Sequence, residues 1–530
     1  MKLNNESLKT HEFWEKAGIT LPRFDREKMI ASSKTEPKWV HFGAGNIFRA
    51  FPAALMQQLL EDGTETSGII VAEGYDGEII DKCFTAFDNL TLLVTLKSDG
   101  ATEKKVIASA AQALRMDREL HSLKEIFAYS SLQMASFTIT EKGYSLKGRG
   151  GELFPDIAED IKTGPVSPKS YLGRIASLLH ERFVRGALPF AMVSMDNCSH
   201  NGDILFAAME AIAKGWDENG KTSGFKDYVC DKNKVSFPWT MIDKITPRPD
   251  DSVRDMLISC GLEDMQGSVT EKNTYIAPFV NAEETQYLVI EDIFPNGRPA
   301  LEKAGVLFTD RETVDRIEKM KVCTCLNPLH TSLAVFGCLL GYTRISEEMK
   351  DADLVKLIEG VGYSEGLPVV TDPGILKPKE FIDQVIKVRL PNPFMPDAPQ
   401  RIAMDSSLKI PIRFGETIKA YKNSSGCKSL KFIPLVFAGW LRYLLGIDDQ
   451  GKPFEVSPDP NYESLSAYLS GITLGQKGPF RSKLEPVLSN PAYFGVNLYD
   501  AGLGETVEDL FAQMLASPGA VRRVLSGACS

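Results

Sequence analysis

A lysine, an asparagine and a histidine stand close together in one segment of the chain. Lys321 is followed by five residues and Asn327, and then by two residues and His330. Residues three apart on a helix share a face, so Asn327 and His330 are expected to lie side by side. Burial lowers the pKa of lysines, which then exchange protons near neutral pH. An asparagine amide can donate to an oxygen that gains charge, and a histidine can orient a substrate. These side chains together suit the removal of a proton from an alcohol while hydride leaves its carbon.

Each of the three residues also has an ordinary structural interpretation. Lys321 could be solvated, and Asn327 could cap a helix that has Pro328 in its first turn. His330 could be a hydrogen-bonded histidine of the core, because the segment from it to Gly341 is strongly apolar. Residue types and spacing alone leave both interpretations open.

A glycine loop near the N-terminus is a second candidate site. A β-like run over residues 39–42 ends at Gly43-Ala44-Gly45, and apolar residues at helical spacing follow. Small residues between a strand and a helix let a pyrophosphate approach the free N–H groups of the helix. Phe48 occupies the place of the third glycine of the dinucleotide fingerprint, so a plain tight turn remains the alternative. The residues predicted to bind the cofactor here are Gly43, Ala44, Gly45, Asn46, Ile47 and Phe48.

An acidic residue ends the next predicted strand, which covers residues 68–73. Glu73 stands there, and Asp76 follows three residues later. A carboxylate at this place can accept a hydrogen bond from a ribose hydroxyl and favours NAD over NADP, although NADP is not excluded. Either residue could instead be a solvated turn residue.

The elements that must position these residues show two patterns. Up to about residue 297, strand-like runs alternate with helical patterns, which predicts βαβ units and a mostly parallel sheet. These runs include residues 90–96, 106–110, 134–140 and 189–194. Turn residues follow at 295–299, and the later patterns are helical. We therefore predict an α/β domain over 1–297 and an all-α domain over 298–530, with no assigned role for 205–236 or for the region after 447.

Composition limits the class of protein. The 60 Lys and Arg against 70 Asp and Glu give a net charge of −10, whereas a nucleic-acid or anionic-membrane surface needs clustered cations. No run approaches the roughly 20 apolar residues of a membrane span, and the N-terminus lacks the pattern of a signal peptide. Nine dispersed cysteines indicate reduced thiols and a cytoplasmic protein. The oligomeric state cannot be predicted.

A metal site is not expected. The six histidines are isolated, and no pair of cysteines or histidines has the spacing of zinc ligands. Asp196 and His200 form the only near cluster, and we do not assign a metal to it.

Several segments together resemble the polyol-specific long-chain dehydrogenases, the mannitol dehydrogenase family. They are the lysine–asparagine–histidine segment and residues 42–50, 138–144, 194–202, 237–247 and 401–409, and they follow the family's order. The resemblance implies a metal-independent, NAD(P)-linked oxidoreductase. It implies a Rossmann-type N-terminal domain, a helical C-terminal domain and an active site between them.

The resemblance also implies roles for the matched residues. Lys321 would be the general base in alcohol oxidation and the general acid in ketone reduction. Asn197 and Asn327 would hold the developing alkoxide, and His330 would position the substrate. Other oxygens of the substrate would be contacted by Asp243, Arg401 and Lys409.

The substrate is expected to be a sugar acid or a polyol, since the family includes mannitol and arabinitol dehydrogenases and reductases of fructuronate and tagaturonate. The glycine loop has Phe48 where the mannitol branch is expected to carry a histidine. A carboxylate would also give an arginine such as Arg401 a bidentate partner. We therefore favour fructuronate reduction and the reverse oxidation of mannonate. Mannitol 2-dehydrogenation is the alternative, and a catalytically silent sugar or nucleotide sensor ranks lower.

Overall fold

The chain divides into two compact units in a computed structural model that describes residues 1–148, 150–424 and 426–530. The first unit comprises residues 1–97 and 101–314, and the second comprises 98–100 and 315–530. The division between the two units therefore falls at 314/315, later in the chain than the predicted boundary at 297/298. The strand β15 (Leu307–Thr309) still pairs in parallel with β14 (Tyr287–Glu291), so the segment after 297 completes a sheet of the first unit.

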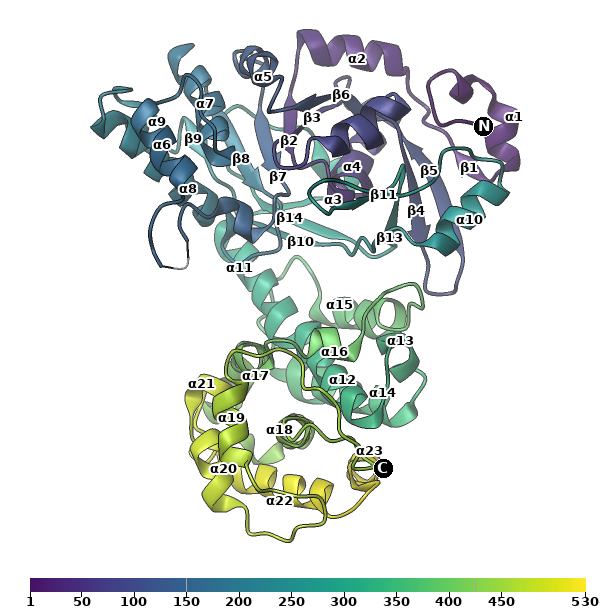
Figure 1. Ribbon diagram of the computed structural model, residues 1–530, viewed down its shortest axis with the longest axis vertical. Helices are drawn as coiled ribbons and strands as arrows, with labels where there is room; N and C mark the ends of the chain where they lie inside the picture. The colour runs from purple at the N-terminus through teal and green to yellow at the C-terminus, as the bar shows by residue number, and fades with distance from the viewer. Residues whose placement is uncertain (149, 425) are drawn as a thin grey trace. The chain divides into compact units, whose positions relative to one another are not determined.

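The first unit is built on a six-stranded sheet with the order β6-β3-β2-β7-β8-β9 (Figure 1). Every neighbouring pair in it is parallel. Numbered along the chain, the order is 3-2-1-4-5-6, which is that of dinucleotide-binding folds. The strands are β2 (Trp39–Phe42), β3 (Ile69–Glu73), β6 (Ala110–Arg115), β7 (Met134–Phe137), β8 (Phe190–Ser194) and β9 (Val235–Ser236). The predicted Rossmann-type α/β class is confirmed.

Helices cover both faces of this sheet, because successive side chains of a buried strand point to opposite sides. Trp39 faces one apolar core, whereas Val40 and Phe42 face the other. The first core is covered by α2 (Arg26–Thr35), α3 (Asn46–Ala50) and α4 (Pro52–Glu61). The second is covered by α5 (Leu120–Phe127), α6 (Pro155–Thr163), α7 (Tyr171–Val184), α8 (Asn201–Glu218) and α9 (Phe225–Cys230). Residues 205–236, which had no predicted role, therefore belong to this packing.

The predicted strand over 90–96 does not join the parallel sheet, and the one predicted over 106–110 straddles the break between two strands, of which only β6 joins that sheet. β4 (Thr91–Leu96) and β5 (Thr102–Ile107) form an antiparallel pair in a separate four-stranded sheet, together with β1 (Ile19–Thr20) and β13 (Phe279–Glu283). A buried strand such as β4 has the same apolar run in either kind of sheet, so the sequence pattern could not show which sheet it joins. The smaller sheets add β10 (Thr240–Asp243), β11 (Ser268–Val269) and β12 (Tyr275–Ile276), and the outer helices are α1 (His11–Lys16) and α10 (Asp251–Ser259).

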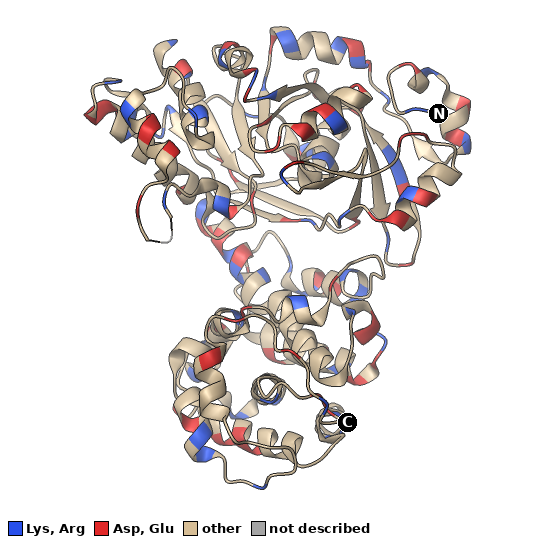
Figure 2. Ribbon diagram, in the orientation of Figure 1, with Lys and Arg blue, Asp and Glu red and all other residues tan. Residues whose placement is uncertain are grey.

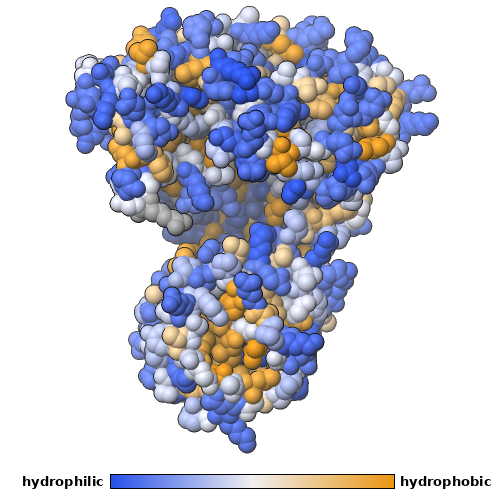
Figure 3. Space-filling model, in the orientation of Figure 1, coloured by the Kyte–Doolittle hydropathy of each residue, from blue (hydrophilic) through white to orange (hydrophobic). Residues whose placement is uncertain are grey.

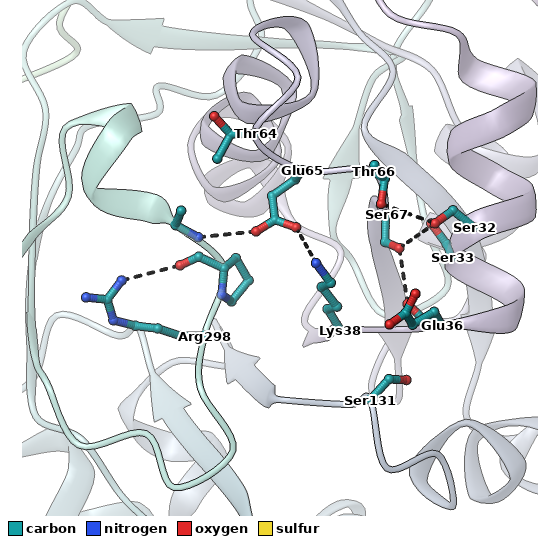
Figure 4. A network of polar contacts seen from close by, with 12 residues as sticks. Ser32, Ser33, Glu36, Lys38, Thr64, Glu65, Thr66, Ser67, Ser131 and Arg298 are labelled. Carbon is teal, nitrogen blue, oxygen red and sulfur yellow. Dashed lines mark hydrogen bonds and ion pairs between the residues drawn. The ribbon is translucent and has the colours of Figure 1, made fainter.

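A polar network lies at the amino-terminal ends of β2 and β3, whereas the glycine loop follows the carboxyl end of β2 (Figure 4). Lys38 Nζ lies 2.8 Å from Glu65 Oε2, and Glu65 Oε1 accepts from the Ala300 N–H at 3.3 Å. The hydroxyls of Ser32 on α2 and of Ser67 are 3.0 Å apart. Because Glu65 is buried, its ion pair is only weakly screened and ties segments distant in the sequence together.

The second unit is helical, which confirms the predicted all-α C-terminal domain. Every regular element in the described part of 315–530 is a helix. The helix α18 is seen end-on in Figure 1, and apolar side chains gather around it on the visible face of this unit (Figure 3). The main helices are α11 (Arg311–Met320), which leads into the unit, α12 (Asn327–Leu340), α13 (Ile345–Glu348), α14 (Ala352–Glu359), α15 (Pro378–Gln384), α16 (Pro399–Ile402), α17 (Ser406–Lys422), α18 (Phe432–Tyr443), α19 (Tyr462–Leu469), α20 (Arg481–Leu488), α21 (Pro491–Phe494), α22 (Gly504–Leu515) and α23 (Ala520–Cys529).

One helical stretch among the described residues, 311–340, is long and apolar enough to cross a membrane by length and composition. However, 78% of its most apolar window is buried inside the protein, as in the core helix of a globular domain. Basic and acidic residues are interspersed along the outer helices of each unit (Figure 2).

Candidate active site

The glycine loop follows β2, at the carboxyl ends of the parallel strands where open α/β sheets bind ligands. Gly43 has φ +107°, and a Cβ there would lie 2.3 Å from the carbonyl oxygen of Thr138, so only glycine fits. Gly45 precedes α3, and a Cβ there would meet no atom within 4 Å. The backbone at Gly45 is therefore open to a close approach by a ligand such as a pyrophosphate.

Glu73 and Asp76 are buried, with 6% and 3% of their surfaces exposed, so the solvated-turn alternative is wrong for both. Glu73 Oε2 accepts from the Ala44 N–H at 2.9 Å, and Glu73 Oε1 accepts from the Tyr75 N–H at 2.8 Å. Asp76 accepts from the Thr270 hydroxyl at 2.6 Å. Glu73 thus holds the glycine loop and places a carboxylate beside it.

Asn46 is oriented by Arg49, whose side chain is almost completely buried. Arg49 donates to Asn46 Oδ1 at 2.9 Å and to the carbonyl oxygen of Ala277 at 2.9 Å. A guanidinium has donors and no acceptor, so the amide oxygen of Asn46 must face it and the amide nitrogen must face away. Burial lowers the pKa of Arg49. Asn46 is partly exposed and can therefore present its N–H groups to an acceptor such as a phosphate oxygen.

The side chain of Phe48 does not face a cofactor, which corrects the prediction made for it from the sequence. It is fully buried and stacks on His41, with ring centroids 4.4 Å apart, so it is not available to a ligand. Burial lowers the pKa of His41 to about 3, and the neutral ring lies within hydrogen-bonding distance of the hydroxyls of Ser136 and Thr138. Phe48 therefore packs beneath the loop, and Ile47 is partly buried against the same core.

The loop residues nevertheless fit a nicotinamide dinucleotide. Gly45 leaves its backbone open, Asn46 is oriented to donate, and Glu73 supplies a carboxylate at the end of the second strand. These are the elements that dinucleotide folds use for the pyrophosphate and the ribose.

Asn197 is exposed just beyond the end of β8. The preceding Asp196 ties this point to the segment after β7, because its carboxylate accepts from the N–H groups of Ile139 at 3.0 Å and Thr140 at 2.9 Å. It also accepts from the Tyr144 hydroxyl at 2.6 Å. Burial raises the pKa of Asp196 and outweighs these hydrogen bonds, which act in the opposite direction. Asn197 therefore extends from a rigid edge of the sheet.

The Asp196–His200 pair has no geometry for a metal. The oxygens of Asp196 are engaged by protein donors, and His200 stacks on Trp239 with ring centroids 4.1 Å apart. The described residues contain no group of three or more His, Cys, Asp or Glu that could hold a metal ion.

Asp243 is the last residue of β10 and is buried. The start of the same strand is joined to the first residue of α8, Asn201, whose Nδ2 donates to Thr240 Oγ1 at 2.8 Å and whose Oδ1 accepts from the Thr240 N–H at 3.0 Å. The Thr240 hydroxyl in turn donates to the carbonyl oxygen of Ser194 at 2.7 Å. The strand that carries Asp243 is therefore fixed to the strand that precedes Asn197.

Lys321 opens a π-helical turn, Lys321–Cys325, between α11 and α12. The Leu326 N–H bonds to the carbonyl oxygen of Lys321 at 3.1 Å, which is the i→i+5 bond of such a turn. Only 4% of Lys321 is exposed, so the solvated-lysine alternative is excluded. Single π-helical turns inside α-helices are frequent at functional sites.

Asn327 is the first residue of α12 and does not occupy its N-cap position. The cap position belongs to Leu326, so the helix-cap alternative is also excluded. His330 follows on the next turn, and its Nε2 lies 3.3 Å from Asp397 Oδ2. The two atoms are within ion-pair distance but lack the angles of a hydrogen bond.

Asp397 links His330 to Arg401 and was not found from the sequence. It forms an ion pair with Arg401 one turn further along the chain. Burial raises the pKa of Asp397, but His330 and Arg401 outweigh burial and hold the pKa below its ordinary value. Arg401 also lines a surface pocket of about 610 Å³ with residues that include Gln400 and Met404. The spacing of four residues between Asp397 and Arg401 was the available sequence signal.

Two basic residues lie one turn apart on α17, Lys409 and Arg413. Lys409 Nζ donates to backbone carbonyl oxygens, the nearer being that of Met404 at 2.5 Å. Arg413 donates to the hydroxyl of Thr331, which donates to the carbonyl oxygen of Asn327 at 3.0 Å. Burial lowers the pKa of Arg413 to about 10, and burial together with the charge of Arg413 lowers that of Lys409.

The comparisons with known proteins agree with this architecture. Residues 37–303 match the mannitol dehydrogenase Rossmann domain, and residues 313–513 match the mannitol dehydrogenase C-terminal domain. A D-mannonate oxidoreductase of Thermotoga maritima is 53% identical over 99% of this chain and 98% of its own. The crystal structure of a D-sorbitol dehydrogenase in substrate-free form is 25% identical with a TM-score of 0.80, over 96% of this chain and 98% of that one. The mannitol 2-dehydrogenase of Pseudomonas fluorescens, solved as a ternary complex with NAD and D-mannitol, is 26% identical with a TM-score of 0.69 and covers 99% of both chains. The chain therefore belongs to the mannitol dehydrogenase family of oxidoreductases.

Proposed function

We propose that the chain is an NAD-linked oxidoreductase that interconverts a hexonate and its ketohexuronate, D-mannonate and D-fructuronate. The observation that carries the substrate is the 53% identity to a D-mannonate oxidoreductase over nearly the full length of both chains. The buried Lys321, with Asn327 and His330 on the following helical turns, supports the chemistry.

Lys321 is the proposed acid–base group. In oxidation it takes the proton of the reacting hydroxyl, and in reduction it returns that proton to the carbonyl oxygen. Its place in a buried π-helical turn keeps bulk water away from this exchange.

The oxygen that gains charge needs donors. Asn197 and Asn327 are proposed to donate to it, which stabilises the alkoxide formed as the proton leaves. His330 is proposed to position the substrate, with the carboxylate of Asp397 beside its Nε2. The other oxygens of the substrate are assigned to Asp243, Arg401 and Lys409.

NAD is the proposed cofactor, held by the backbone at Gly43, Ala44 and Gly45, by Asn46 and by the carboxylate of Glu73. When bound it supplies the hydride acceptor for oxidation and, as NADH, the hydride donor for reduction. The carboxylate of Glu73 is fixed beside the loop, where it would repel the additional phosphate of NADP.

The substrate is tested by steady-state rates with D-fructuronate and with D-fructose under NADH, and by the same pair under NADPH. We expect a higher kcat/KM for D-fructuronate and a preference for NADH. The alternative function is mannitol 2-dehydrogenation, favoured by the likeness to the complex with NAD and D-mannitol. A clear preference for D-fructose would establish that alternative in place of the proposed one.

The mechanism is tested by Lys321→Ala. This variant should lose kcat while its affinity for NADH, measured by fluorescence titration, stays close to wild type. Lys319→Ala is the matched control, because Lys319 is an exposed lysine two residues earlier that pairs with Asp315. Near wild-type turnover by Lys321→Ala would show that the proton goes elsewhere.

Two further assignments belong to this proposal. The reaction is proposed to need no metal, so exhaustive chelation should leave the rate unchanged. All nine cysteines, each in the described part of the chain, are free thiols, which supports a cytoplasmic location.

A further inference from the structure

We propose that Lys409 and Arg413 form the subsite for the carboxylate of the sugar acid, and that Arg413 sets the preference for a sugar acid over an uncharged ketose. The inference rests on the proposed function, since only a hexonate or hexuronate brings a carboxylate to the site. It assigns to these two residues the role that the sequence analysis gave to Arg401.

The first argument is the balance of charge around the three basic residues. Arg401 is already paired with Asp397, so its positive charge is compensated within the protein. Lys409 and Arg413 have no ion pair anywhere in the described chain, and their hydrogen-bond partners are carbonyl oxygens and a neutral hydroxyl. Two partly buried cations are therefore left without a counter-charge.

The acidic residues nearest to Lys409 do not supply that counter-charge. Asp405 and Asp459 raise the pKa of Lys409, but burial and the charge of Arg413 outweigh them. The carboxylate of Asp459 is engaged by the hydroxyl of Ser406 and the N–H of Ser407. Like charges one helical turn apart destabilise each other, and an anion between them would remove this cost.

The second argument is the position of the pair. The helix α17 packs against both the π-helical turn that begins at Lys321 and α12. Thr417 donates to the carbonyl oxygen of Cys323 at 3.3 Å, and Arg413 donates to Thr331. Arg413 therefore lies on the side of α17 that faces the segment with Lys321 and Asn327. The two cations therefore lie on a helix that packs directly against the turn carrying the proposed acid–base group.

The third argument is the chemistry of the two groups. A guanidinium has five N–H donors in a planar fork that suits the two oxygens of a carboxylate, and the structure uses one hydrogen bond of Arg413 within the protein. An ammonium group at Lys409 adds a second charge-assisted donor. The terminal hydroxymethyl group of a ketose is uncharged and cannot form an ion pair with Lys409 or Arg413. The pair therefore discriminates between the two classes of substrate.

The test is the ratio of kcat/KM for D-fructuronate to that for D-fructose under saturating NADH. Arg413→Met should lower this ratio roughly 10- to 100-fold, mainly through the KM for D-fructuronate, as expected for a lost charge-assisted contact. Lys422→Met is the control, because Lys422 is an exposed lysine at the end of the same helix, and both rates should stay at wild type. Arg401→Met should affect both substrates to a similar degree, since Arg401 acts beside Asp397.

Arg413→Lys carries the test if the methionine variant does not fold. It keeps the charge but lacks the fork, so the ratio should fall selectively and by less, about 3- to 10-fold. An equal loss with both substrates in the variant that folds would overturn the inference and make Arg413 a packing residue. A wild-type enzyme without a preference for D-fructuronate would instead refute the proposed function, and the subsite with it.

Discussion

The carboxyl group of Glu348 predicts an unusual pH dependence of stability. Glu348 ends α13, is completely buried, and neither of its oxygens has a hydrogen-bond partner among the described residues. It lies directly against α12, because a Cβ added to Gly337 would be 2.1 Å from Glu348 Oε1. Burial, with a smaller contribution from the charge of Asp351, raises the pKa of Glu348 from 4.5 to about 9. The folded protein therefore keeps this side chain protonated at neutral pH.

The energetic consequence follows from the difference between the folded and unfolded pKa. Below pH 4.5 Glu348 is protonated in both states, and it has no pH-dependent effect on stability. Between pH 4.5 and 9 the folded state holds one more proton than the unfolded state, so its stability falls by about 1.4 kcal/mol per pH unit. The accumulated cost is about 3 kcal/mol at pH 7 and about 6 kcal/mol at pH 9.

Glu348→Gln removes the titration and keeps the shape of the side chain. The free energy of unfolding of the second unit can be followed in urea by hydrogen exchange of peptides from α12, at pH 5, 7 and 8.5. Relative to wild type, the variant should become more stable by about 1.4 kcal/mol for each pH unit. Glu347→Gln is the control, because Glu347 is half exposed and pairs with Lys350. A difference between Glu348→Gln and wild type that stays constant across this range would refute the reasoning.

Three other predictions concern single contacts. Gly43→Ala should destabilise the first unit by roughly 2–4 kcal/mol in thermal unfolding, because its Cβ meets Thr138. Gly45→Ala should fold normally but weaken NADH binding, measured by fluorescence titration. Asn46→Asp should keep its contact with Arg49 but raise the Kd for NADH about 10- to 100-fold, since it replaces donors by charge near the pyrophosphate; an unchanged Kd would contradict the orientation given to this amide. Asp397→Asn should lower stability at neutral pH. Since the folded pKa of Asp397 is lowered, its contribution is present above the ordinary carboxyl pKa and is lost as the pH falls through the folded value, so the unfolding curves of variant and wild type should converge in acid.

The parallel sheet and the glycine loop could be predicted because their signals are local. A short apolar run, a glycine pair and a helical pattern follow one another within residues 39–59, and the strand with Glu73 comes next. The antiparallel pair β4–β5 could not be recognised in the same way. Its partners β1 and β13 are distant in the sequence, and an apolar run does not reveal its neighbours.

The candidate site was predictable where residues share one segment, as with Asn327 and His330. Asp397 and Arg413 were missed because they reach that segment only through tertiary packing, Asp397 from the loop before α16 and Arg413 from α17. The four-residue spacings Asp397–Arg401 and Lys409–Arg413 were visible, but spacing alone does not show which side chains are buried or what they contact.

The central position of α12 also has a consequence for protein synthesis. This apolar helix packs against α16, α17, α18 and α23, all of which leave the ribosome later than α12 does. The first unit can complete its sheets once residues up to β15 have emerged, whereas α12 must wait uncovered for its partners. During that interval the nascent chain exposes this strongly apolar segment, and chaperone binding should concentrate there.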